Sequence, residues 1–139
     1  MGGPARQIVG NAGLYLVCYE LTKRGWNVLP TARNARGVDV VIYSEDASPQ
    51  MNTVQVKALS KRDAVPLGAK LDHLIADFFI VCTHVLGDAP RVFTMFRSDV
   101  RCWAQRDAKG NYWLEPASYE PYEGRWDLIG RGDDAARRD

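Results

Sequence analysis

Two stretches of this sequence carry most of the information about its fold: Gly37-Val38-Asp39-Val40-Val41-Ile42-Tyr43 and Thr53-Val54-Gln55-Val56-Lys57-Ala58-Leu59. Both have the length and the β-branched content of strands, and the polar residues 44–50 predict the turn of a hairpin between them. Side chains alternate between the faces of a strand, so Gln55 and Lys57 point the same way, roughly 7 Å apart. Antiparallel pairing then brings Asp39 near both of them. An acid, an amide oxygen and an ammonium group would meet there, where a hard cation and a phosphate can bind.

A helix is expected before the first of these strands. The segment from Gly10 or Asn11 to about Arg24 is apolar nearly all round, which predicts a well-buried helix, and Gly25 ends it. Glu20 lies on a face of this helix that should be packed, so its carboxylate needs a partner, because an unpaired buried charge is costly. A structural ion pair and an acid beside a metal ion both meet that need.

Shorter patterns predict the rest of the fold. They are a short helix over Gly68–Ile75, a strand buried on both faces over Asp77–Thr83, a strand over Val92–Phe96, a helix over Asp99–Gln105 capped by Ser98, and a short strand over Tyr112–Leu114. Tyr15 and Tyr19, one helical turn apart, are expected in the core. Trp126, Leu128 and Ile129 are expected to hold the C-terminal segment on the core.

Length and composition predict one domain. A chain of 139 residues, 46% hydrophobic and 25% charged, has the size and balance of a single globular unit over residues 1–129. Residues 130–139 are rich in Gly, Asp and Arg and are expected to form a disordered tail. No apolar stretch is long enough to cross a bilayer, and the first residues lack the apolar core of a signal peptide, so we expect a cytoplasmic protein without a membrane partner. The three cysteines have apolar neighbours and are expected to be reduced, buried thiols.

The net charge of +1 neither requires nor excludes a nucleic-acid partner. Basic residues nevertheless flank the Asp39 and Lys57 segments: Arg33 and Arg36 precede Asp39, and Lys61 and Arg62 follow Lys57. Such residues form either an ordinary solvated surface or a patch that binds phosphate.

The order of Glu20, then Gly37-Val38-Asp39, then Gln55-Val56-Lys57 resembles the PD-(D/E)XK nuclease superfamily, which includes many restriction endonucleases and archaeal-type Holliday-junction resolvases. The resemblance covers about residues 8–96. It implies a restriction-endonuclease-like α/β fold, a mixed β-sheet flanked by helices with an α-β-β-β-α-β core, and often a homodimer. In this family a helix carries the first acid, and a hairpin carries a metal-binding Asp and a Glu-x-Lys pair. Gln55 departs from that pattern, because Glu is usual at its position.

The resemblance implies a Mg²⁺-dependent nuclease that acts on DNA, with Mn²⁺ as a substitute ion. Glu20, Asp39, Gln55 and Lys57 would be the catalytic residues. The ion would be held by Asp39, the Gln55 side chain and the Val56 backbone carbonyl, with Glu20 acting directly or through water. The loop residues Arg33, Arg36, Lys61 and Arg62 would contact the nucleic-acid backbone.

The sequence is compatible with three functions. The first is a metal-dependent DNA endonuclease; because so small a chain has little room for a specificity domain, selection of DNA structure or a partner subunit is favoured over recognition of a long sequence. The second is a nucleic-acid-binding module of the same fold in which Gln55 has removed catalysis. The third is an interaction partner of another protein, without nucleic acid.

Overall fold

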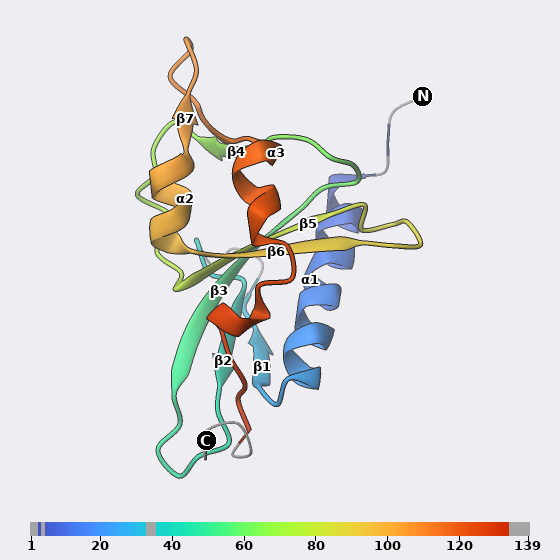
Figure 1. The fold of residues 1–139 in the computed structure, drawn as a ribbon, viewed down its shortest axis with the longest axis vertical. Helices are drawn as coiled ribbons and strands as arrows, with labels where there is room; N and C mark the ends of the chain where they lie inside the picture. The colour runs from blue at the N-terminus through green and yellow to red at the C-terminus, as the bar shows by residue number, and fades with distance from the viewer. Residues whose placement is uncertain (1–2, 4, 33–35, 134–139) are drawn as a thin grey trace.

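The fold, a computed structural model, is described for residues 3, 5–32 and 36–133. Helix α1 (Arg6–Lys23) is followed by β1 (Asn27–Pro30), β2 (Val40–Tyr43) and β3 (Met51–Ala58). The chain continues through β4 (Val65–Gly68), β5 (Phe78–Thr83), β6 (Arg91–Phe96), α2 (Arg97–Trp103), β7 (Gln105–Arg106), β8 (Tyr112–Leu114) and α3 (Pro116–Tyr119). Two 3₁₀ helices, Glu120–Tyr122 and Trp126–Leu128, complete it (Figure 1).

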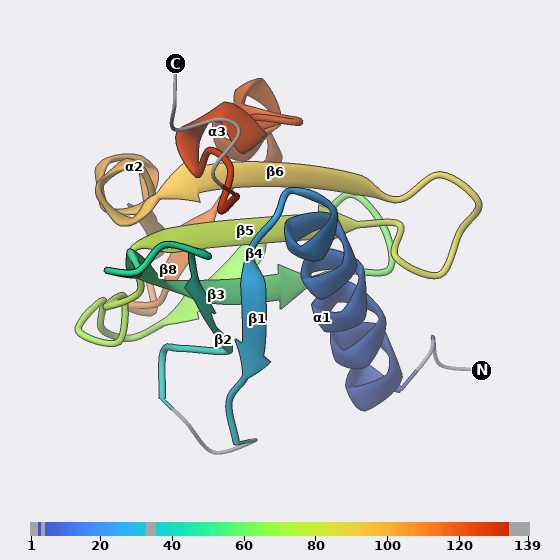
Figure 2. The ribbon, with the colours of Figure 1, turned by 90° about the horizontal axis from the view of Figure 1, so that it is seen from below.

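The main sheet is mixed, as expected. Its five strands lie in the order β1-β2-β3-β5-β6, and β3 with β5 is the parallel pair among antiparallel ones. A smaller sheet has the order β4-β8-β7. Helix α1 lies beside one face of the main sheet, and α2 and α3 lie beside the other (Figure 2). The predicted mixed sheet flanked by helices is therefore confirmed.

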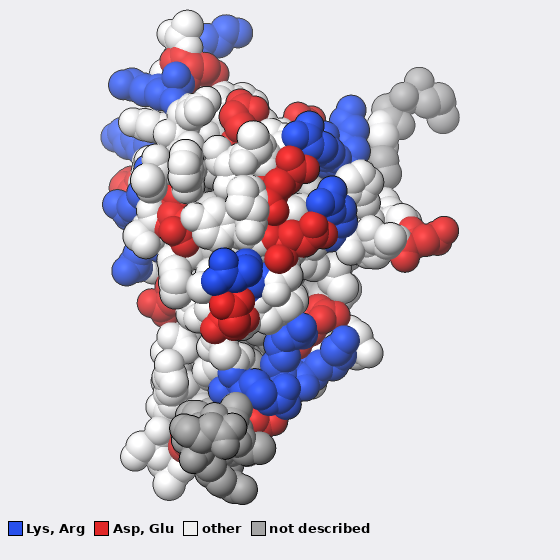
Figure 3. Space-filling model, viewed as in Figure 1, with Lys and Arg blue, Asp and Glu red and all other residues white. Residues whose placement is uncertain are grey.

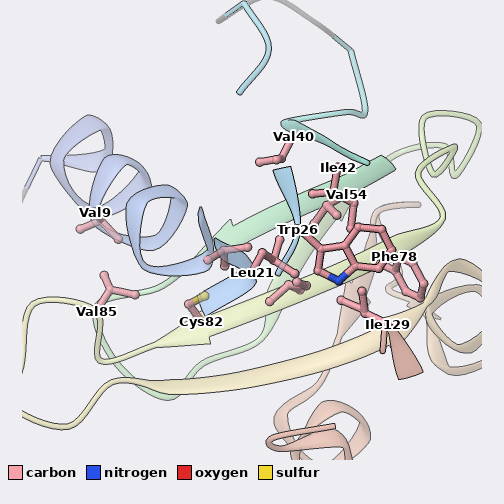
Figure 4. Packing of buried hydrophobic residues seen from close by; sticks show 12 residues of the cluster. Val9, Leu21, Trp26, Val40, Ile42, Val54, Phe78, Cys82, Val85 and Ile129 are labelled. Atoms are coloured by element: carbon pink, nitrogen blue, oxygen red, sulfur yellow. The ribbon is translucent and has the colours of Figure 1, made fainter. Parts of the chain in front are cut away.

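Strand β5 shows why the chain folds in layers. All six of its residues are buried, and their side chains alternate between two hydrophobic clusters. Ile80 and Cys82 pack in the cluster under α1, which Figure 4 shows around Leu21 and Trp26. Phe79 and Val81 pack in the second cluster, on the side of α2 and the smaller sheet. A strand buried on both faces reads as a continuous apolar run, which is the pattern predicted from the sequence.

Helix α1 packs closely on β3. A Cβ atom on Gly13 would lie 2.4 Å from the Cβ of Ala58, so only glycine permits this approach. The helix begins at Arg6, earlier than the expected start at Gly10 or Asn11, and this first part faces the end of β3. No helix in the described part of the chain is both long and apolar enough to cross a membrane.

The helix predicted over Gly68–Ile75 is wrong. In place of a helix between β3 and β5, the chain forms β4, with its alternating burial, and then turns. Tertiary contacts favour a non-helical backbone in this segment. The Arg97 guanidinium donates a hydrogen bond to the Ile75 carbonyl, and Arg101 donates one to the Leu74 carbonyl. These partners come from α2 and cannot be seen in the local sequence.

The second predicted helix is shifted. Helix α2 runs from Arg97 to Trp103, so Ser98 lies inside it and does not cap it. The Asp99 carboxylate instead accepts a hydrogen bond from the Phe96 backbone N–H. Val100 is buried in the core, whereas Trp103 is 48% exposed.

The C-terminal segment is ordered further than expected. Trp126 and Ile129 pack in the cluster under α1, as predicted. Residues 130–133, expected in the tail, instead bridge two turns of the chain: Gly132 N–H donates to the Arg24 carbonyl, and Glu45 N–H donates to the Gly132 carbonyl. Residues 134–139 lie outside the described residues.

The cysteines differ from one another. Cys82 is buried, Cys18 is half-buried and Cys102 is exposed, so the expectation of three buried thiols is wrong for Cys102. Burial raises the pKa of the Cys82 thiol to about 12.

Candidate active site

The candidate site lies where β2 and β3 separate. Val40 and Val54 are the last register pair of the two strands on this side, and Asp39 stands just beyond it. The Asp39 backbone is held on both sides, because its N–H donates to the Val54 carbonyl and its carbonyl accepts from Thr31 N–H, each at 2.9 Å. Residues 36–39 project on the side of the molecule opposite α2 and α3 (Figure 2).

Where the two strands separate, the Asp39 carboxylate accepts a backbone hydrogen bond from β3 in place of a backbone carbonyl of β2. Its Oδ2 accepts from the Val56 backbone N–H at 2.7 Å. The N–H and C=O of one strand residue point to the same edge, so the Val56 carbonyl also faces this opening. One carboxylate oxygen is thus fixed, and the carboxylate lies beside a backbone carbonyl oxygen.

Gln55 is the unusual residue of the site. Its side chain is only 6% exposed, and its Oε1 atom is buried without a hydrogen-bond partner among the described residues. Continuing the register of β2 and β3 by one pair places Gln55 opposite Asp39. Leaving a buried acceptor unpaired costs about 1–3 kcal/mol. Within the described residues, Gln55 Oε1 is therefore an acceptor without a donor, at the strand position opposite Asp39.

Lys57 follows on the same face of β3, as the alternation predicts. Its side chain is half-buried, and within residues 3, 5–32 and 36–133 it has neither a hydrogen bond nor an ion pair. It lines a cavity of about 610 Å³ at the end of β3. The cation is therefore available to an anionic ligand.

Asp39 and Val56 line a separate cavity of about 300 Å³. Its other walls come from α1, through Gly10, Asn11 and Leu14, and from the segment after β1. The sequence interpretation missed Asn11, because it placed the helix start there. A polar side chain within an otherwise apolar helix was the signal that could have identified it.

The structure does not bring Glu20 to this cavity. Nine residues separate Asn11 from Glu20, which is two and a half helical turns and about 14 Å along α1, on the opposite side of the helix. The Glu20 carboxylate instead accepts hydrogen bonds from Arg24 at 2.9 Å and from Lys23 at 3.4 Å. The structural ion pair, one of the two alternatives for this residue, is the one that the geometry favours.

The four predicted backbone-binding residues have different settings. Arg36 is exposed and pairs with Asp72, Lys61 is exposed, and Arg33 lies outside the described residues. Arg62 forms a two-pronged pair with Glu120, which lowers the pKa of that carboxyl. Figure 3 shows basic and acidic side chains interspersed on the face that carries the 3₁₀ helices, as such pairs require.

Gly37 allows the loop before Asp39 to pack closely against the backbone of His73. Its φ is +76°, and a Cβ atom there would lie 2.4 Å from the His73 carbonyl oxygen. Any residue with a Cβ atom would therefore block this approach. Glycine at this position lets the turns after β4 support the segment that ends in Asp39.

The donors present suit a hard divalent cation. The Asp39 carboxylate, the unpaired Gln55 Oε1 and the Val56 carbonyl are all oxygens, the ligand type that Mg²⁺ prefers. They carry a single negative charge between them. No group of three or more His, Cys, Asp or Glu side chains able to hold a metal occurs within the described part of the chain. The residues fit such an ion with a weak, mostly neutral set of ligands.

No known family profile and no curated protein sequence matches this chain. Its fold does match solved structures. The bacterial homing endonuclease I-Ssp6803I has 17% sequence identity and a TM-score of 0.62, over 91% of this chain and 93% of that one. The Holliday junction resolvase Hjc from Archaeoglobus fulgidus has 15% identity and a TM-score of 0.57, over 84% of this chain and 99% of that one. Both have the restriction-endonuclease-like PD-(D/E)XK fold, and the chain described here shares it.

Proposed function

We propose that this chain, which has the PD-(D/E)XK nuclease fold, is a metal-dependent endonuclease that acts on DNA. The two similar structures are a homing endonuclease and a Holliday junction resolvase, which supports DNA as the substrate. The observation that carries the proposal is that the buried Gln55 Oε1, opposite Asp39, and Lys57, two residues further on, have no partner within the described part of the chain.

Asp39, Gln55 and the Val56 carbonyl would hold Mg²⁺, for which Mn²⁺ can substitute. When bound, the ion would neutralise charge on the phosphate and lower the pKa of the attacking water. The hydrogen bond from Val56 N–H orients the Asp39 carboxylate before any ligand arrives, because it fixes one of the two oxygens. Asn11, across the cavity, offers an amide that can position a water molecule.

Lys57 would act on the phosphate itself. Its ammonium group can hold the attacking water or stabilise the negative charge that develops on the phosphoryl oxygens. Arg36 and Lys61 are exposed beside the site and would contact the DNA backbone without reading its sequence. Glu20 is left out of this assignment, because its carboxylate is paired on the far side of α1.

Cleavage of labelled DNA tests the proposal. Duplex, single-stranded, flap and four-way-junction substrates are incubated with Mg²⁺ or Mn²⁺ and with the variants Asp39→Asn and Lys57→Met. Asn keeps an acceptor for Val56 N–H and removes only the charge. Each variant should lower the rate about 100-fold or more, whereas Lys70→Met, an exposed control, should not. If none of the substrates is cleaved in a metal-dependent way, the proposed nuclease activity is contradicted.

A second function has an observation of its own. The ligand set around Asp39 holds one carboxylate and neutral oxygens, and the described residues contain no acidic cluster. A DNA-binding module that has lost catalysis would show the same features. It is distinguished by salt-dependent DNA binding without detectable Mn²⁺ binding or cleavage.

The resemblance also implies a homodimer, which we retain as part of the proposal. Tyr15 and Tyr19, expected in the core, are 63% and 61% exposed on α1, and Ile8 nearby is 57% exposed. These side chains give α1 an exposed apolar surface that a second copy can cover. Sedimentation equilibrium of the full chain and of Tyr15→Ser tests this: a monomeric wild-type protein contradicts the dimer.

A further inference from the structure

The 610 Å³ cavity beside the site has a lining that the cleavage reaction does not by itself require. Lys57 lines it at the end of β3, and Arg6 lines it from the start of α1. Lys57 is also one of the proposed catalytic residues, so the cavity meets the proposed site at this side chain. A volume of this size is within the range of about 300–1,000 Å³ that small-molecule sites occupy.

One wall of this cavity is an oriented aromatic ring. Trp113 on β8 pairs in register with Pro66 on β4, and both residues line the cavity. The Trp113 indole N–H donates to Asp107 Oδ2 at 2.8 Å. Hydrogen bonds from the Asn111 backbone and from this indole hold the pKa of the Asp107 carboxyl below its usual range. The ring is therefore fixed by a tight turn before any ligand binds.

The opposite part of the cavity is cationic. Neither Arg6 nor Lys57 has a hydrogen bond or an ion pair with another of the residues that the structure describes. The first turn of α1 contains no acidic residue, so the positive end of the helix dipole adds to the charge of Arg6. Asp63 also lines the cavity, and its Oδ1 accepts a hydrogen bond from Ala64 N–H. An anion would be held by the two cations, with apolar surface between it and Trp113.

We infer that this cavity binds an unpaired nucleotide of a DNA strand, with the base against Trp113 and Pro66 and the phosphate at Arg6 and Lys57. A base inside a duplex is stacked on both faces, so only an unpaired or extruded base can present its face to an indole. The inference rests on the proposed function and narrows its substrate class to DNA with an unpaired nucleotide next to the cleaved bond.

Binding without cleavage tests the inference. Fluorescence anisotropy of labelled dT12 and of a 12-base-pair duplex is measured in EDTA, for the wild-type protein, Trp113→Leu and Trp113→Phe. Loss of one stacked base should weaken dT12 binding by roughly 5- to 100-fold in Trp113→Leu. Duplex binding should stay within about twofold, because no base stacks on the ring in that complex. Trp113→Phe keeps a ring and should bind dT12 more tightly than Trp113→Leu.

Trp103→Leu is the matched control, because Trp103 is an exposed tryptophan on α2 that does not line this cavity. Its dT12 affinity should equal that of the wild type. A second measurement needs no variant: a single-stranded oligonucleotide with one 2-aminopurine should lose fluorescence on binding the wild-type protein, as the base stacks on indole. Unchanged dT12 affinity in Trp113→Leu, equal losses for dT12 and duplex, or unchanged 2-aminopurine fluorescence would overturn the inference.

The two proposals fail in different ways. If the protein binds dT12 through Trp113 but cleaves no substrate, the inference about the cavity is kept and the nuclease proposal is contradicted. If the protein cleaves DNA but Trp113→Leu binds dT12 as tightly as the wild type, the nuclease proposal is kept and the nucleotide cavity is contradicted.

Discussion

The proposed chemistry depends most on Gln55. It lies opposite Asp39, at a position where the resembled family usually has Glu, and its Oε1 is buried without a partner among the described residues. Gln provides the oxygen of Glu without the charge, so it should bind a divalent ion more weakly. It also avoids burying a second carboxylate beside Asp39, which would be costly in the absence of a cation.

The variant Gln55→Glu should therefore have two opposite effects. Without metal, a second buried carboxylate beside Asp39 should lower the melting temperature. With metal, the added charge should strengthen Mn²⁺ binding at least tenfold, equivalent to about 1.4 kcal/mol, and raise the cleavage rate. Calorimetric titration with Mn²⁺ and thermal melting with and without Mn²⁺ measure both effects. Gln50→Glu, on the exposed hairpin turn, is the control; equal Mn²⁺ affinities in the two variants would contradict the assignment.

Gly37 is tested in the same way by a pair of variants. Gly37 and Gly68 both have positive φ, at +76° and +82°, but only Gly37 has a neighbour that a Cβ atom would meet. Gly68→Ala should lose about 1–2 kcal/mol through the left-handed backbone alone. Gly37→Ala should lose more, about 3 kcal/mol in total, because the His73 carbonyl must also move. Urea unfolding measures both, and equal losses would show that the close approach has no energetic role.

Among the elements, the turn between α1 and β1 is held by the C-terminal segment. Gly132 N–H donates to the Arg24 carbonyl, the Trp26 indole donates to the Gly130 carbonyl, and Gly132 accepts from Glu45 N–H. A Cβ atom on Gly132 would lie 2.6 Å from the Trp26 ring, so glycine is required in this contact. These bonds join the end of α1 to the β2–β3 hairpin, and so help to set the position of α1 against the strands of the site.

Truncation measures this contribution. A chain ending at Ile129 loses the three hydrogen bonds and should be less stable than a chain ending at Asp133 by about 3 kcal/mol, at about 1 kcal/mol for each bond. Both chains lack residues 134–139, so the comparison isolates residues 130–133. Equal urea midpoints for the two chains would contradict the contribution.

For the whole molecule, the two hydrophobic clusters on the faces of the main sheet determine which groups solvent can reach. Cys82 lies inside the cluster under α1 and its thiol has a pKa raised to about 12, so it stays protonated and shielded at neutral pH. Cys102 lies on the surface of α2. Thiol reactivity depends on the thiolate form and on access, so the two should differ widely.

Titration with a disulfide reagent at pH 8 should therefore show one fast thiol in the native protein. Cys102→Ser should remove the fast phase, and Cys82 should react only when guanidinium unfolds the chain. All three thiols of the wild type should react in guanidinium, which serves as the control. A fast phase of unchanged size in Cys102→Ser would show that a cluster opens readily.

The sequence alone was enough to predict the hairpin, the buried strand β5 and the neighbouring strand positions of Asp39, Gln55 and Lys57, because strand alternation and antiparallel pairing are local rules. It also indicated the fold class, through the order and spacing of those residues. Local rules did not extend to Gly68–Ile75, whose apolar residues suit a helix but whose carbonyls are bonded to arginines of α2.

Long-range packing in the tertiary structure sets which groups lie near one another at the candidate site. It separated Glu20 from Asp39 by turning it to the far side of α1, and it brought Asn11 to the cavity in its place. It also placed Trp113 and Arg6, more than a hundred residues apart in the chain, on one cavity beside Lys57. Such contacts depend on how a helix is rotated and where a distant strand pairs, which are set by packing of the whole core and not by the neighbours of any one residue.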